Sequence, residues 1–563
     1  MSEPVQTFFQ RDFSGGMNTR DNPASLNDNE FSLAYNNRIS ERGIAKKRYG
    51  SAPLVAGETS TATISGLFSF FSTSTAEHLY RCQNGIWKEY NGSAFTTAFT
   101  TVSTKYSRAI IFDGPTDTIA TSGSGTITDA TVNTLTYGGG GWTTNSLADK
   151  VVKMTTGGST GEEKVIASNT RNELTIYGQW NNTPIAPSDF TIYETAPQAM
   201  VYNGSDTPFK VKTITATKST RFDLPLIPNL IFALVWNGRV WGFTKNSSKL
   251  WFSDISNFES FPDNNYIQID AGDGQFLQAL GITTLGLAIY KDYKTGILTG
   301  NSVDTYAFDI RDHKHGCMAP DSVKSWKGIS ISLDKAGVYA FNGQDNLPIG
   351  RPIENQLDTS LALMVNAKAN VFDDKYYLSY PATSAATGNN RTLVYDLKFG
   401  AWAGIDTLGY NAYTLYGGNN YATKDNTVKV YRLENGTYND DTATINWQLD
   451  TKEWDLGSIG MRKKHKDLFV EAAGITTSTN VNIKSEVDNA GFSLVGNMDI
   501  GGAGALWDTA EWDVSIWAGA DNLIEKFRIG EKGRNIKLRF TNNTTNQVSL
   551  YKYEISFLQK KVK

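Results

Sequence analysis

The residue types best suited to chemistry gather in one short stretch near the middle of the chain. His313, His315 and Cys317 occupy alternate positions. In an extended strand, alternate residues lie on one face, so these three would form part of a tetrahedral zinc site. A fourth ligand is not identifiable nearby. We therefore favour the alternative, a polar loop with a semi-buried cysteine, and expect no bound metal.

Acidic residues are numerous but do not specify a reaction. The turn Asp270–Gly274 is acidic, yet it lacks the alternating oxygen ligands and terminal glutamate of an EF-hand, and we interpret it as a hairpin turn. Carboxylates could form a glycosidase-like pair in the centre of a propeller, but no spacing selects a pair. The sequence contains no evident nucleophile elbow with a supporting histidine, phosphate-binding loop or dinucleotide fingerprint. We expect the chain not to be an enzyme and to need no cofactor.

The N-terminal segment combines a glycine pair with a predicted helix. Gly15 and Gly16 allow the backbone to turn through positive φ. Asn27 and Glu30 have the spacing of a capping box. The apolar residues that follow form one stripe at helical spacing, which predicts a helix over about 27–38 that packs on another surface.

A basic cluster follows this predicted helix. Its cations lie between Arg38 and Arg48 and suit an acidic partner surface or a phosphate backbone. We predict a docking segment over residues 1–55, and the alternative is a solvated N-terminal arm. The candidate assembly-interface residues are Phe13, Gly15, Gly16, Asn18, Arg20, Asn36, Asn37, Arg38, Lys46, Lys47, Arg48, Tyr49 and Gly50.

Length and composition predict a folded, multi-domain, all-β protein. The chain has 563 residues, which favours two to four domains over a single core. Hydrophobic residues make up 40% and charged residues 20%, as in folded proteins. Aromatic residues make up 12%, glycines number 51, and helical periodicity is scarce. Such a profile is typical of many short strands joined by turns.

Charge and cysteine content limit the partners and the compartment. The net charge of −4 provides no overall basic surface for tight nucleic-acid binding, so contact with DNA should be transient and non-specific. Cys82 and Cys317 are the only cysteines, which favours folding in a reducing cytoplasm without disulfides. Neither a cleaved signal sequence nor a membrane span is expected, and we expect a soluble protein.

Repeated hairpin signals predict the central architecture. Asn84-Gly85, Asn237-Gly238 and Asn342-Gly343 each lie between β-branched or aromatic runs, a strong signal for two-residue hairpin turns. Hairpins at blade-sized intervals predict a β-propeller of six to eight blades over residues 56–115 and 196–440. The alternative is a tandem series of sandwiches, which periodicity alone does not exclude.

Two further β regions are predicted beside the propeller. Residues 116–195 are rich in Thr, Gly and Ser with scattered strands, which indicates a small inserted β domain; the alternative is a long flexible loop. Residues 441–563 alternate apolar and polar side chains, as in a C-terminal β-sandwich. The basic run Arg462–Lys466 within it is interpreted as a solvated strand edge in preference to a nucleic-acid contact.

The start of the chain resembles one protein family. The Phe-x-Gly-Gly motif at Phe13, the Asn-Asn pair before Arg38 and the Lys-Lys-Arg-Tyr-Gly run ending at Gly50 resemble the opening of tail nozzle (tail tubular) proteins of short-tailed bacteriophages, a family of packaged-DNA-stabilising hubs. Tyr49 stands where that family commonly has proline.

Later segments resemble the same family. Residues 241–261 resemble its propeller blades, and Asp334–Tyr339 resembles its recurring Gly-Val-Tyr strand. Residues 450–471 resemble its C-terminal β domain. The resemblance thus covers the N-terminus, the central repeats and the end of the chain.

The resemblance implies a structural virion protein of the phage tail, made in the host cytoplasm. It implies a ring of six copies that extends the DNA channel below the portal and adaptor, retains the packaged DNA and conducts it during ejection. The implied partners are other copies of the chain, adaptor or head-completion proteins, tail fibre or spike proteins and, transiently, genomic DNA. The candidate interface residues would then serve docking between subunits or rings.

Two other classes of function remain open from the sequence. A receptor- or glycan-binding tail adhesin could stack sugar rings on Trp87, Trp142, Trp241 and Trp251, although tryptophans in β repeats are more often packing residues. A propeller hydrolase is the weaker of the two hypotheses.

Overall fold

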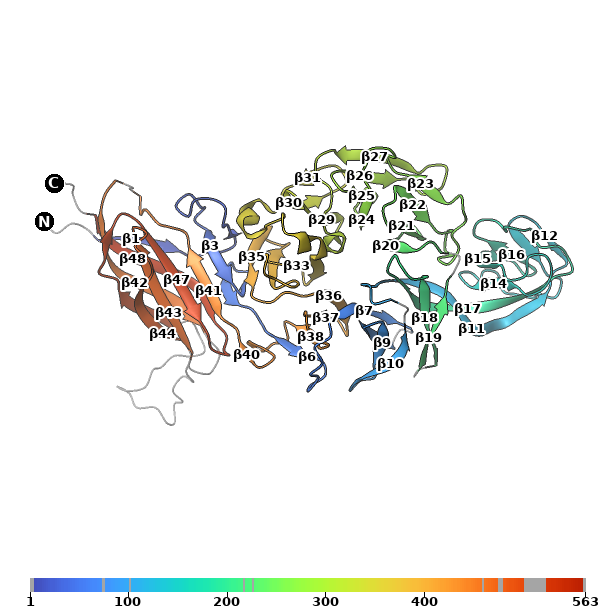
Figure 1. The fold of residues 1–563 in the computed structure, drawn as a ribbon, viewed down its shortest axis with the longest axis horizontal. Helices are drawn as coiled ribbons and strands as arrows, with labels where there is room; N and C mark the ends of the chain where they lie inside the picture. Colours follow the sequence, from blue (N-terminus) through green and yellow to red (C-terminus); the bar gives the residue numbers. More distant parts are fainter. Residues whose placement is uncertain are drawn as a thin grey trace.

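The computed structural model describes residues 5–72, 76–100, 103–215, 218–224, 227–457, 460–473, 479–500 and 523–559. Its described residues form three bodies, with a sandwich at one end, a ring of sheets in the middle and a small projecting domain at the other end (Figure 1). The helical segments in this part of the chain are the 3-10 helices η1 (Pro320–Ser322), η2 (Arg351–Gln356) and η3 (Ala362–Asn366). The predicted all-β class is therefore confirmed. No described helix is long and apolar enough to span a bilayer.

The central body is a β-propeller. Its inner strands are β7, β11, β20, β24, β28, β32 and β36, and each contacts the next before β36 returns to contact β7. The described residues thus form seven blades, within the predicted range of six to eight. We number the blades 1 to 7 in the order of these inner strands.

Five blades are continuous four-stranded meanders. These are blade 1 with β7 (Ile64–Phe71), β8 (Glu77–Gln83), β9 (Ile86–Tyr90) and β10 (Phe95–Thr100); blade 3 with β20 (Leu230–Trp236), β21 (Arg239–Thr244), β22 (Lys249–Phe252) and β23 (Tyr266–Gln268); blade 4 with β24 (Leu277–Ile282), β25 (Leu287–Lys291), β26 (Thr295–Thr299) and β27 (Ala307–Asp312); blade 5 with β28 (Lys324–Trp326), β29 (Ile329–Asp334), β30 (Gly337–Phe341) and β31 (Asn346–Leu347); and blade 6 with β32 (Lys368–Phe372), β33 (Lys375–Tyr380), β34 (Arg391–Asp396) and β35 (Ala401–Asp406).

Two blades are assembled from separated segments. Blade 2 contains β11 (Arg108–Thr126), β17 (Asp189–Tyr202), β18 (Phe209–Thr215) and β19 (Lys218–Asp223). Blade 7 contains β36 (Ala412–Tyr416), β37 (Asn419–Thr423), β38 (Val430–Leu433) and β6 (Ser51–Pro53). Two short strands, β39 (Asn439–Asp440) and β40 (Ala443–Thr444), extend this sheet beyond β6. In blade 7 the N-terminal strand β6 pairs with β38, with Ser51 opposite Leu433. The chain therefore closes its own ring, and β38 is not left as an exposed edge.

The hairpin turns follow from local backbone preference. Asn84 and Gly85 have φ values of 51° and 75°, and Asn237 and Gly238 have values of 49° and 67°. Two successive positive φ values define a type I′ turn, which matches the twist of the strands on either side. These turns join β8 to β9 and β20 to β21, as the sequence predicted.

Apolar packing between neighbouring blades holds the ring together. Trp241 and Phe243 of blade 3 belong to one buried cluster with Leu287 and Ile289 of blade 4. A four-stranded sheet of this size has two apolar faces and must bury them against its neighbours. This requirement explains why the strands of the meanders are apolar on both faces.

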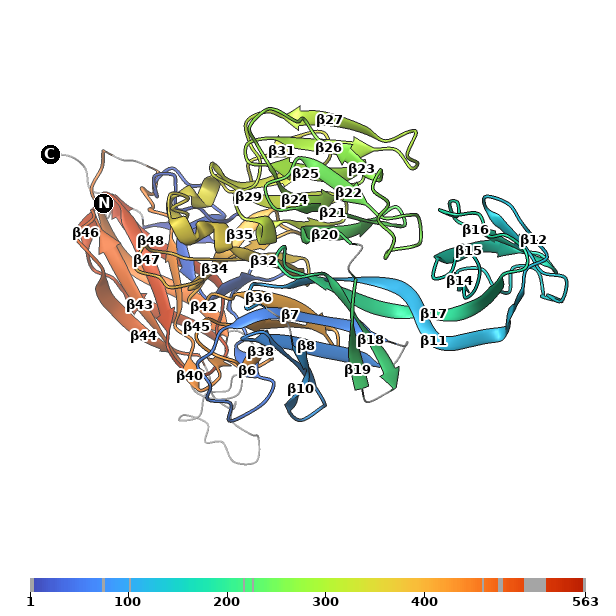
Figure 2. The same ribbon diagram turned by 45° about the vertical axis from the view of Figure 1, so that its right-hand side comes forward.

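The inserted β domain lies between the first and second strands of blade 2. It contains β12 (Asp129–Ala130), β13 (Thr134–Thr136), β14 (Val151–Met154), β15 (Glu163–Asn169) and β16 (Glu173–Ile176). The long strands β11 and β17 run out of the propeller as a ribbon that carries it (Figure 2). It has its own core, in which Leu135, Val152 and Leu174 are buried, so the predicted inserted domain is confirmed.

The third body is a β-sandwich made from both ends of the chain. One sheet contains β4 (Asn37–Ile39), β5 (Ala45–Lys47), β48 (Ser549–Gln559), β42 (Lys463–Ala473) and β45 (Leu523–Arg528), with β1 (Gln6–Gln10) on β48 and β46 (Lys532–Gly533) on β42. The other continues from blade 6 through β3 (Glu30–Tyr35), β41 (Trp447–Thr451), β47 (Ile536–Asn542), β43 (Asn480–Val487) and β44 (Ser493–Asp499), with β2 (Gly16–Met17) on β3. The predicted C-terminal sandwich is confirmed, and the N-terminal strands complete it.

The predicted helix over 27–38 is wrong. Residues Glu30–Tyr35 form β3, which lies between β35 and β41 in the ten-stranded sheet. The Glu30 carboxylate does accept a hydrogen bond from the Asn27 N–H at 2.7 Å, as a capping box requires, but here it stabilises a turn before a strand. Pairing in the sheet buries Phe31 and Ala34 on the strand and overrides their helical spacing.

Candidate functional site

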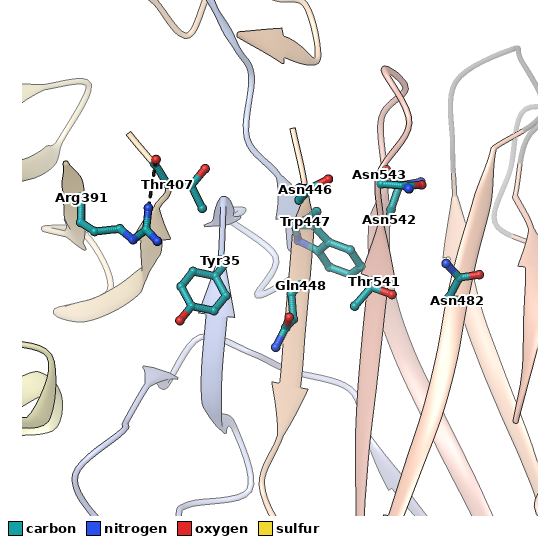
Figure 3. A pocket seen from close by; sticks show the side chains of 10 residues that line it. All are labelled: Tyr35, Arg391, Thr407, Asn446, Trp447, Gln448, Asn482, Thr541, Asn542 and Asn543. Carbon is teal, nitrogen blue, oxygen red and sulfur yellow. Dashed lines mark hydrogen bonds between the residues drawn. The ribbon is translucent and has the colours of Figure 1, made fainter. Parts of the chain in front are cut away.

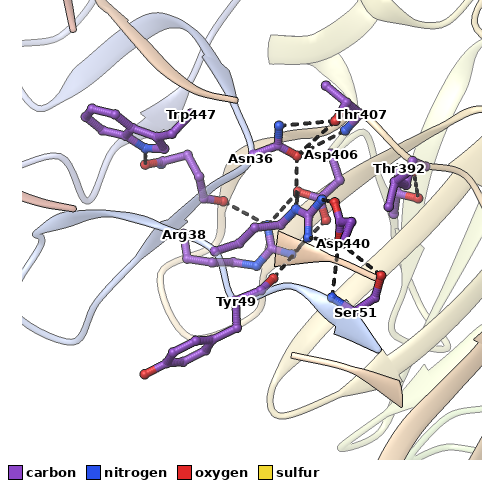
Figure 4. Close-up of polar contacts among 12 residues, drawn as sticks. Asn36, Arg38, Tyr49, Ser51, Thr392, Asp406, Thr407, Asp440 and Trp447 are labelled. Atoms are coloured by element: carbon purple, nitrogen blue, oxygen red, sulfur yellow. Dashed lines mark hydrogen bonds and ion pairs between the residues drawn. The ribbon is translucent and has the colours of Figure 1, made fainter. Parts of the chain in front are cut away.

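The basic cluster of the leader, residues 5–50, forms a buried ion network with blades 6 and 7 (Figure 4). The Arg38 guanidinium contacts both carboxylate oxygens of Asp406, at 2.9 and 2.7 Å, and the Glu434 carboxylate at 2.7 Å. The Arg48 guanidinium makes two bonds to Asp440, at 3.0 and 2.5 Å. We call these five residues the leader junction. Paired bonds of this kind fix orientation as well as charge.

The charges of the leader junction stabilise one another. Burial lowers the pKa of Arg48, but the carboxylates of Asp406 and Asp440 outweigh burial and hold that pKa above its ordinary value. Burial raises the pKa of Asp440, and Arg48 outweighs it, so the pKa of Asp440 is lowered. Both members of the Arg48–Asp440 pair are therefore charged near neutral pH. Removal of one member would leave an unpaired buried charge.

Two asparagines connect the leader junction to the sandwich. Asn36 adopts a left-handed backbone conformation with φ of 53°; its amide oxygen accepts from Arg48 at 2.9 Å and its amide nitrogen donates to the Asn446 carbonyl at 2.7 Å. Asn37 accepts a bond of 3.1 Å from the Trp447 indole. Both asparagine side chains are buried. The leader thus joins the propeller to the first strand of the C-terminal sandwich.

Most of the predicted interface residues lie inside the chain. Those that are buried are Phe13, Gly16, Asn18, Asn36, Asn37, Arg38, Lys47, Arg48 and Gly50, and Gly15 and Lys46 are partly buried. Arg20 and Tyr49 are exposed; Arg20 pairs with Glu354 at 3.0 Å, and the Tyr49 ring packs at a tilt against Tyr438. The leader therefore docks on its own chain, and its role toward a second copy stays a prediction that concerns these exposed residues.

A shallow polar cavity of about 330 Å³ lies beside the leader junction (Figure 3). Tyr35, Gln448, Thr541 and Asn482 stand opposite one another on four neighbouring strands and form a row across the sheet. Arg391 extends this row on the propeller side, where it donates to the Thr407 carbonyl at 3.1 Å. The cavity is the polar outer face of the sheet that joins the two bodies.

A second group of buried charges bridges the channel of the propeller. Arg108 and Lys368 are the first residues of β11 and β32, in blades 2 and 6. Asp321, in η1 before blade 5, lies between them, with the Arg108 nitrogens at 2.7 Å from its oxygens and the Lys368 ammonium at 2.5 Å. We call Arg108, Asp321 and Lys368 the channel triad. It ties blades 2 and 6 to η1, which precedes blade 5.

The electrostatics of the channel triad depend on burial. Burial raises the pKa of Asp321, but Arg108 and Lys368 outweigh it and hold that pKa far below its ordinary value. Burial lowers the pKa of Lys368, and the charge of Asp321 opposes this effect. Lys324, the first residue of β28, has its pKa lowered chiefly by burial. In the described part of the chain, no hydrogen bond or ion pair engages the Lys324 ammonium.

A cavity of about 530 Å³, with Lys368 of this triad in its lining, lies at the end of the ring where the inner strands begin. We call it the mouth cavity. Its lining comes from blades 1, 2, 6 and 7 and from η3: Thr63, Ile64, Ser65, Asn84, Thr104, Tyr106, Leu363, Asn366, Lys368, Thr387, Gly388, Asn389, Asn411 and Asp425. Amide and hydroxyl groups dominate this lining. No sequence pattern indicates this cavity, because its residues come from separate turns.

The stretch considered for zinc has other partners. The His315 ring bonds to Asp312 at 2.8 Å and stacks on Tyr339, with ring centroids 4.3 Å apart. The Cys317 thiol is buried and donates to the Ala319 carbonyl at 3.2 Å. Among the described residues, no group of three or more His, Cys, Asp or Glu side chains is placed to hold a metal ion.

The acidic turn considered for calcium holds lysines instead. Asp273 accepts from Lys291 at 2.7 Å and from Lys294 at 2.9 Å, and Asp270 accepts from Lys294 at 2.6 Å. Burial raises the pKa of Asp273, but the lysine bonds outweigh it and lower the pKa. The turn joins β23 of blade 3 to β24 of blade 4, so it connects two blades and is not the predicted hairpin turn. Its carboxylates bind it to β25 and to the turn between β25 and β26.

The tryptophans considered for sugar stacking are mostly internal. Trp87 and Trp241 are fully buried, and Trp142 is 6% exposed in the core of the inserted domain. Trp251 is partly buried and packs against Tyr266. These residues pack the blades and the inserted domain. This agrees with the alternative interpretation, in which tryptophans in β repeats are packing residues.

Comparison with known proteins gives only distant likenesses. No family model matches the sequence, and no curated protein matches it. Among solved structures, YCF48 bound to a D1 peptide is 9% identical, with a TM-score of 0.33, over 69% of this chain and 96% of that chain. The WD40 domain of SCAP from fission yeast is 8% identical, with a TM-score of 0.24, over 62% of this chain and 92% of that chain. An exo-beta-1,3-galactanase from Phanerochaete chrysosporium is 12% identical, with a TM-score of 0.20, over 57% of this chain and 95% of that chain. Likenesses this weak carry no argument about function.

Proposed function

We propose that this chain is a structural virion protein, a nozzle or hub subunit of a short-tailed phage. In this proposal, six copies form a ring that extends the DNA channel below the portal and adaptor. The ring retains packaged DNA and conducts it during ejection, and its outer surface contacts adaptor and fibre or spike proteins. Contact with DNA is transient, since the chain carries a net charge of −4 and phosphates are not held by it.

One observation supports this proposal above the others. Parts of the N-terminal, central and C-terminal segments that resemble the nozzle family share one buried apolar cluster, which contains Phe13, Val338 and Trp454. Arg38 and Arg48 of the leader bind the end of the propeller, and Asn37 binds Trp447 at the start of the sandwich. Lys452, in the C-terminal segment, donates to the Leu26 carbonyl at 2.6 Å. These parts of the resembling segments thus form one structural unit, as expected for a subunit whose bodies must keep fixed positions in a ring, whereas residues 241–261 pack in blade 3.

The leader cannot be tested by deletion, because it supplies β1 to β5 to the sandwich and β3 lies inside a sheet. Loss of residues before Gly50 would remove these strands and expose the sandwich core. Single changes at exposed leader residues are the appropriate variants.

The test is the assembly state of the full chain, measured by light scattering after gel filtration and by electron microscopy. The proposal expects closed rings, alone or on the head-to-tail connector of the virion. Tyr49→Ala, at a leader residue that is 43% exposed, should weaken ring formation. Tyr293→Ala is the matched control, because Tyr293 is 46% exposed on the propeller. A chain absent from purified virions would contradict the tail assignment.

A further inference from the structure

Three cations gather at the mouth of the propeller around the carboxylate of Asp321, and a second carboxylate, Asp425, lines the mouth cavity. Arg108, Lys324 and Lys368 are the first residues of three inner strands, and inner strands of a propeller begin at one end of the ring. Asp321 is the carboxylate that pairs with Arg108 and Lys368. Lys324 has no such partner in the described part of the chain. Buried cations without counter-charges are costly unless an anion joins them.

Lys368 brings this charge to the mouth cavity. It is 9% exposed and lines the cavity, and its ammonium lies 3.5 Å from the centre of the Tyr106 ring. Asp321 accepts one of its three protons. A carboxylate in the cavity would be held by Lys368 and by the field of the cations behind it.

The rest of the lining suits hydroxyl groups. Asn389 is 5% exposed, and its amide nitrogen donates to the carbonyls of Asn366 and Tyr410 at 3.1 and 2.9 Å. Its amide oxygen has no partner among the described residues. Asp425 accepts from the Thr63 hydroxyl at 2.8 Å, and carboxylates have further acceptor positions. The cavity therefore offers hydrogen-bond acceptors beside a cation.

We propose that the mouth cavity binds an acidic sugar, with its carboxylate at Lys368 and its hydroxyls at Asn389 and Asp425. A volume of about 530 Å³ is within the range of small-molecule sites and exceeds what a simple inorganic anion needs. A sugar fits these acceptors better than a phosphate does, because the hydroxyl groups of a sugar donate hydrogen bonds and a phosphate has few donors. This inference does not depend on the tail assignment, because it uses only the propeller mouth.

Calorimetric titration of the full chain with D-glucuronate tests the inference, with D-glucose as the neutral match and inorganic phosphate as the simple anion. Glucuronate should bind at least tenfold more tightly than either. Lys368→Gln should weaken this binding at least tenfold, since the charge that holds the carboxylate is lost. Lys327→Gln is the matched control, because Lys327 is an exposed lysine that also pairs with an aspartate, Asp374, and it should leave binding unchanged.

A second variant protects the test against misfolding of Lys368→Gln. Asn411 lines the cavity and is not part of the channel triad. Asn411→Asp introduces a negative charge on a side chain of nearly the same shape. It should reduce glucuronate affinity several-fold while the melting temperature stays close to that of the parent. Equal binding of glucose and glucuronate, tightest binding of phosphate, or unchanged affinity in folded Lys368→Gln and Asn411→Asp would each overturn the inference.

Discussion

Arg48 and Asp440 form a buried ion pair between residues that are 392 positions apart in the sequence. The pair stands where the leader, the last blade and the sandwich meet, and Arg48 also contacts Asn36 and Asp406. The Arg48 side chain thus links the leader to Asp406 at the end of blade 6 and to Asp440 beside blade 7. This arrangement gives the basic cluster of the leader a structural role that the sequence did not reveal.

The first prediction concerns the shape of this pair. Arg48→Lys keeps the charge but cannot reproduce two parallel bonds to Asp440 and a third to Asn36, because lysine carries a single ammonium. Arg48→Met removes the charge and leaves Asp440 unpaired, which should cost about 3–5 kcal/mol of unfolding free energy. Arg48→Lys should cost less. Denaturant unfolding checks this order, and equal stability of parent and Arg48→Met would contradict it. Lys335→Met, at an exposed propeller lysine, is the control.

The second prediction concerns the glycine that ends the leader motif. A Cβ on Gly50 would lie 1.8 Å from the Asn439 carbonyl oxygen, so Gly50→Ala must displace the backbone where β6 passes β39. We expect a loss of several kcal/mol and a lower melting temperature. Gly158→Ala is the control, since no heavy atom lies within 4 Å of its added Cβ. Similar melting temperatures for the two variants would show that Gly50 is not constrained.

The local part of this fold could be predicted from the sequence. Asn84-Gly85 and Asn237-Gly238 determine their turns through the backbone preferences of two residues, and the apolar runs beside them form the expected strands. The inserted domain and the sandwich were recognised from composition and alternation. In each case the signal and the structure lie within the same short segment.

The remaining part depends on contacts between distant segments. Phe31 and Ala34 have helical spacing, and only pairing with β41 makes their segment a strand. Ser51 closes blade 7 by pairing with Leu433, which no local pattern indicates. The channel triad likewise joins Arg108 of blade 2 and Lys368 of blade 6 to Asp321 in η1. Such residues can be assigned only when the topology is known.

The third prediction concerns the two cysteines. Cys82 and Cys317 are each 1% exposed, and burial raises the pKa of the Cys317 thiol to about 12. The thiolate is the reactive form, so the folded chain should not react with Ellman's reagent at pH 8. Both thiols should react after unfolding in guanidinium. Rapid labelling of one thiol in the folded protein would contradict the packing of its blade.

The fourth prediction concerns acid stability of the sandwich. His465 on β42 is fully buried, and neither ring nitrogen has a partner in the described part of the chain. Burial, assisted by the charge of Lys463, lowers its pKa from 6.5 to about 4. The unfolded chain therefore binds a proton at higher pH than the folded chain does. Stability contributed by neutral His465 is present above pH 6.5 and is lost as the pH falls toward 4, by about 1.4 kcal/mol for each pH unit.

His465→Leu tests this assignment, because leucine is apolar and does not titrate. The variant should lose less unfolding free energy than the parent between pH 6.5 and 4, with a difference on the order of 3 kcal/mol over that interval. His313→Leu is the control, since His313 is an exposed histidine on the propeller and its removal should leave the pH dependence of the parent. Urea unfolding at several pH values, followed by tryptophan fluorescence, measures both. Parallel pH profiles for the parent and His465→Leu would show that His465 is solvated or paired, and that acid acts on the sandwich through other groups.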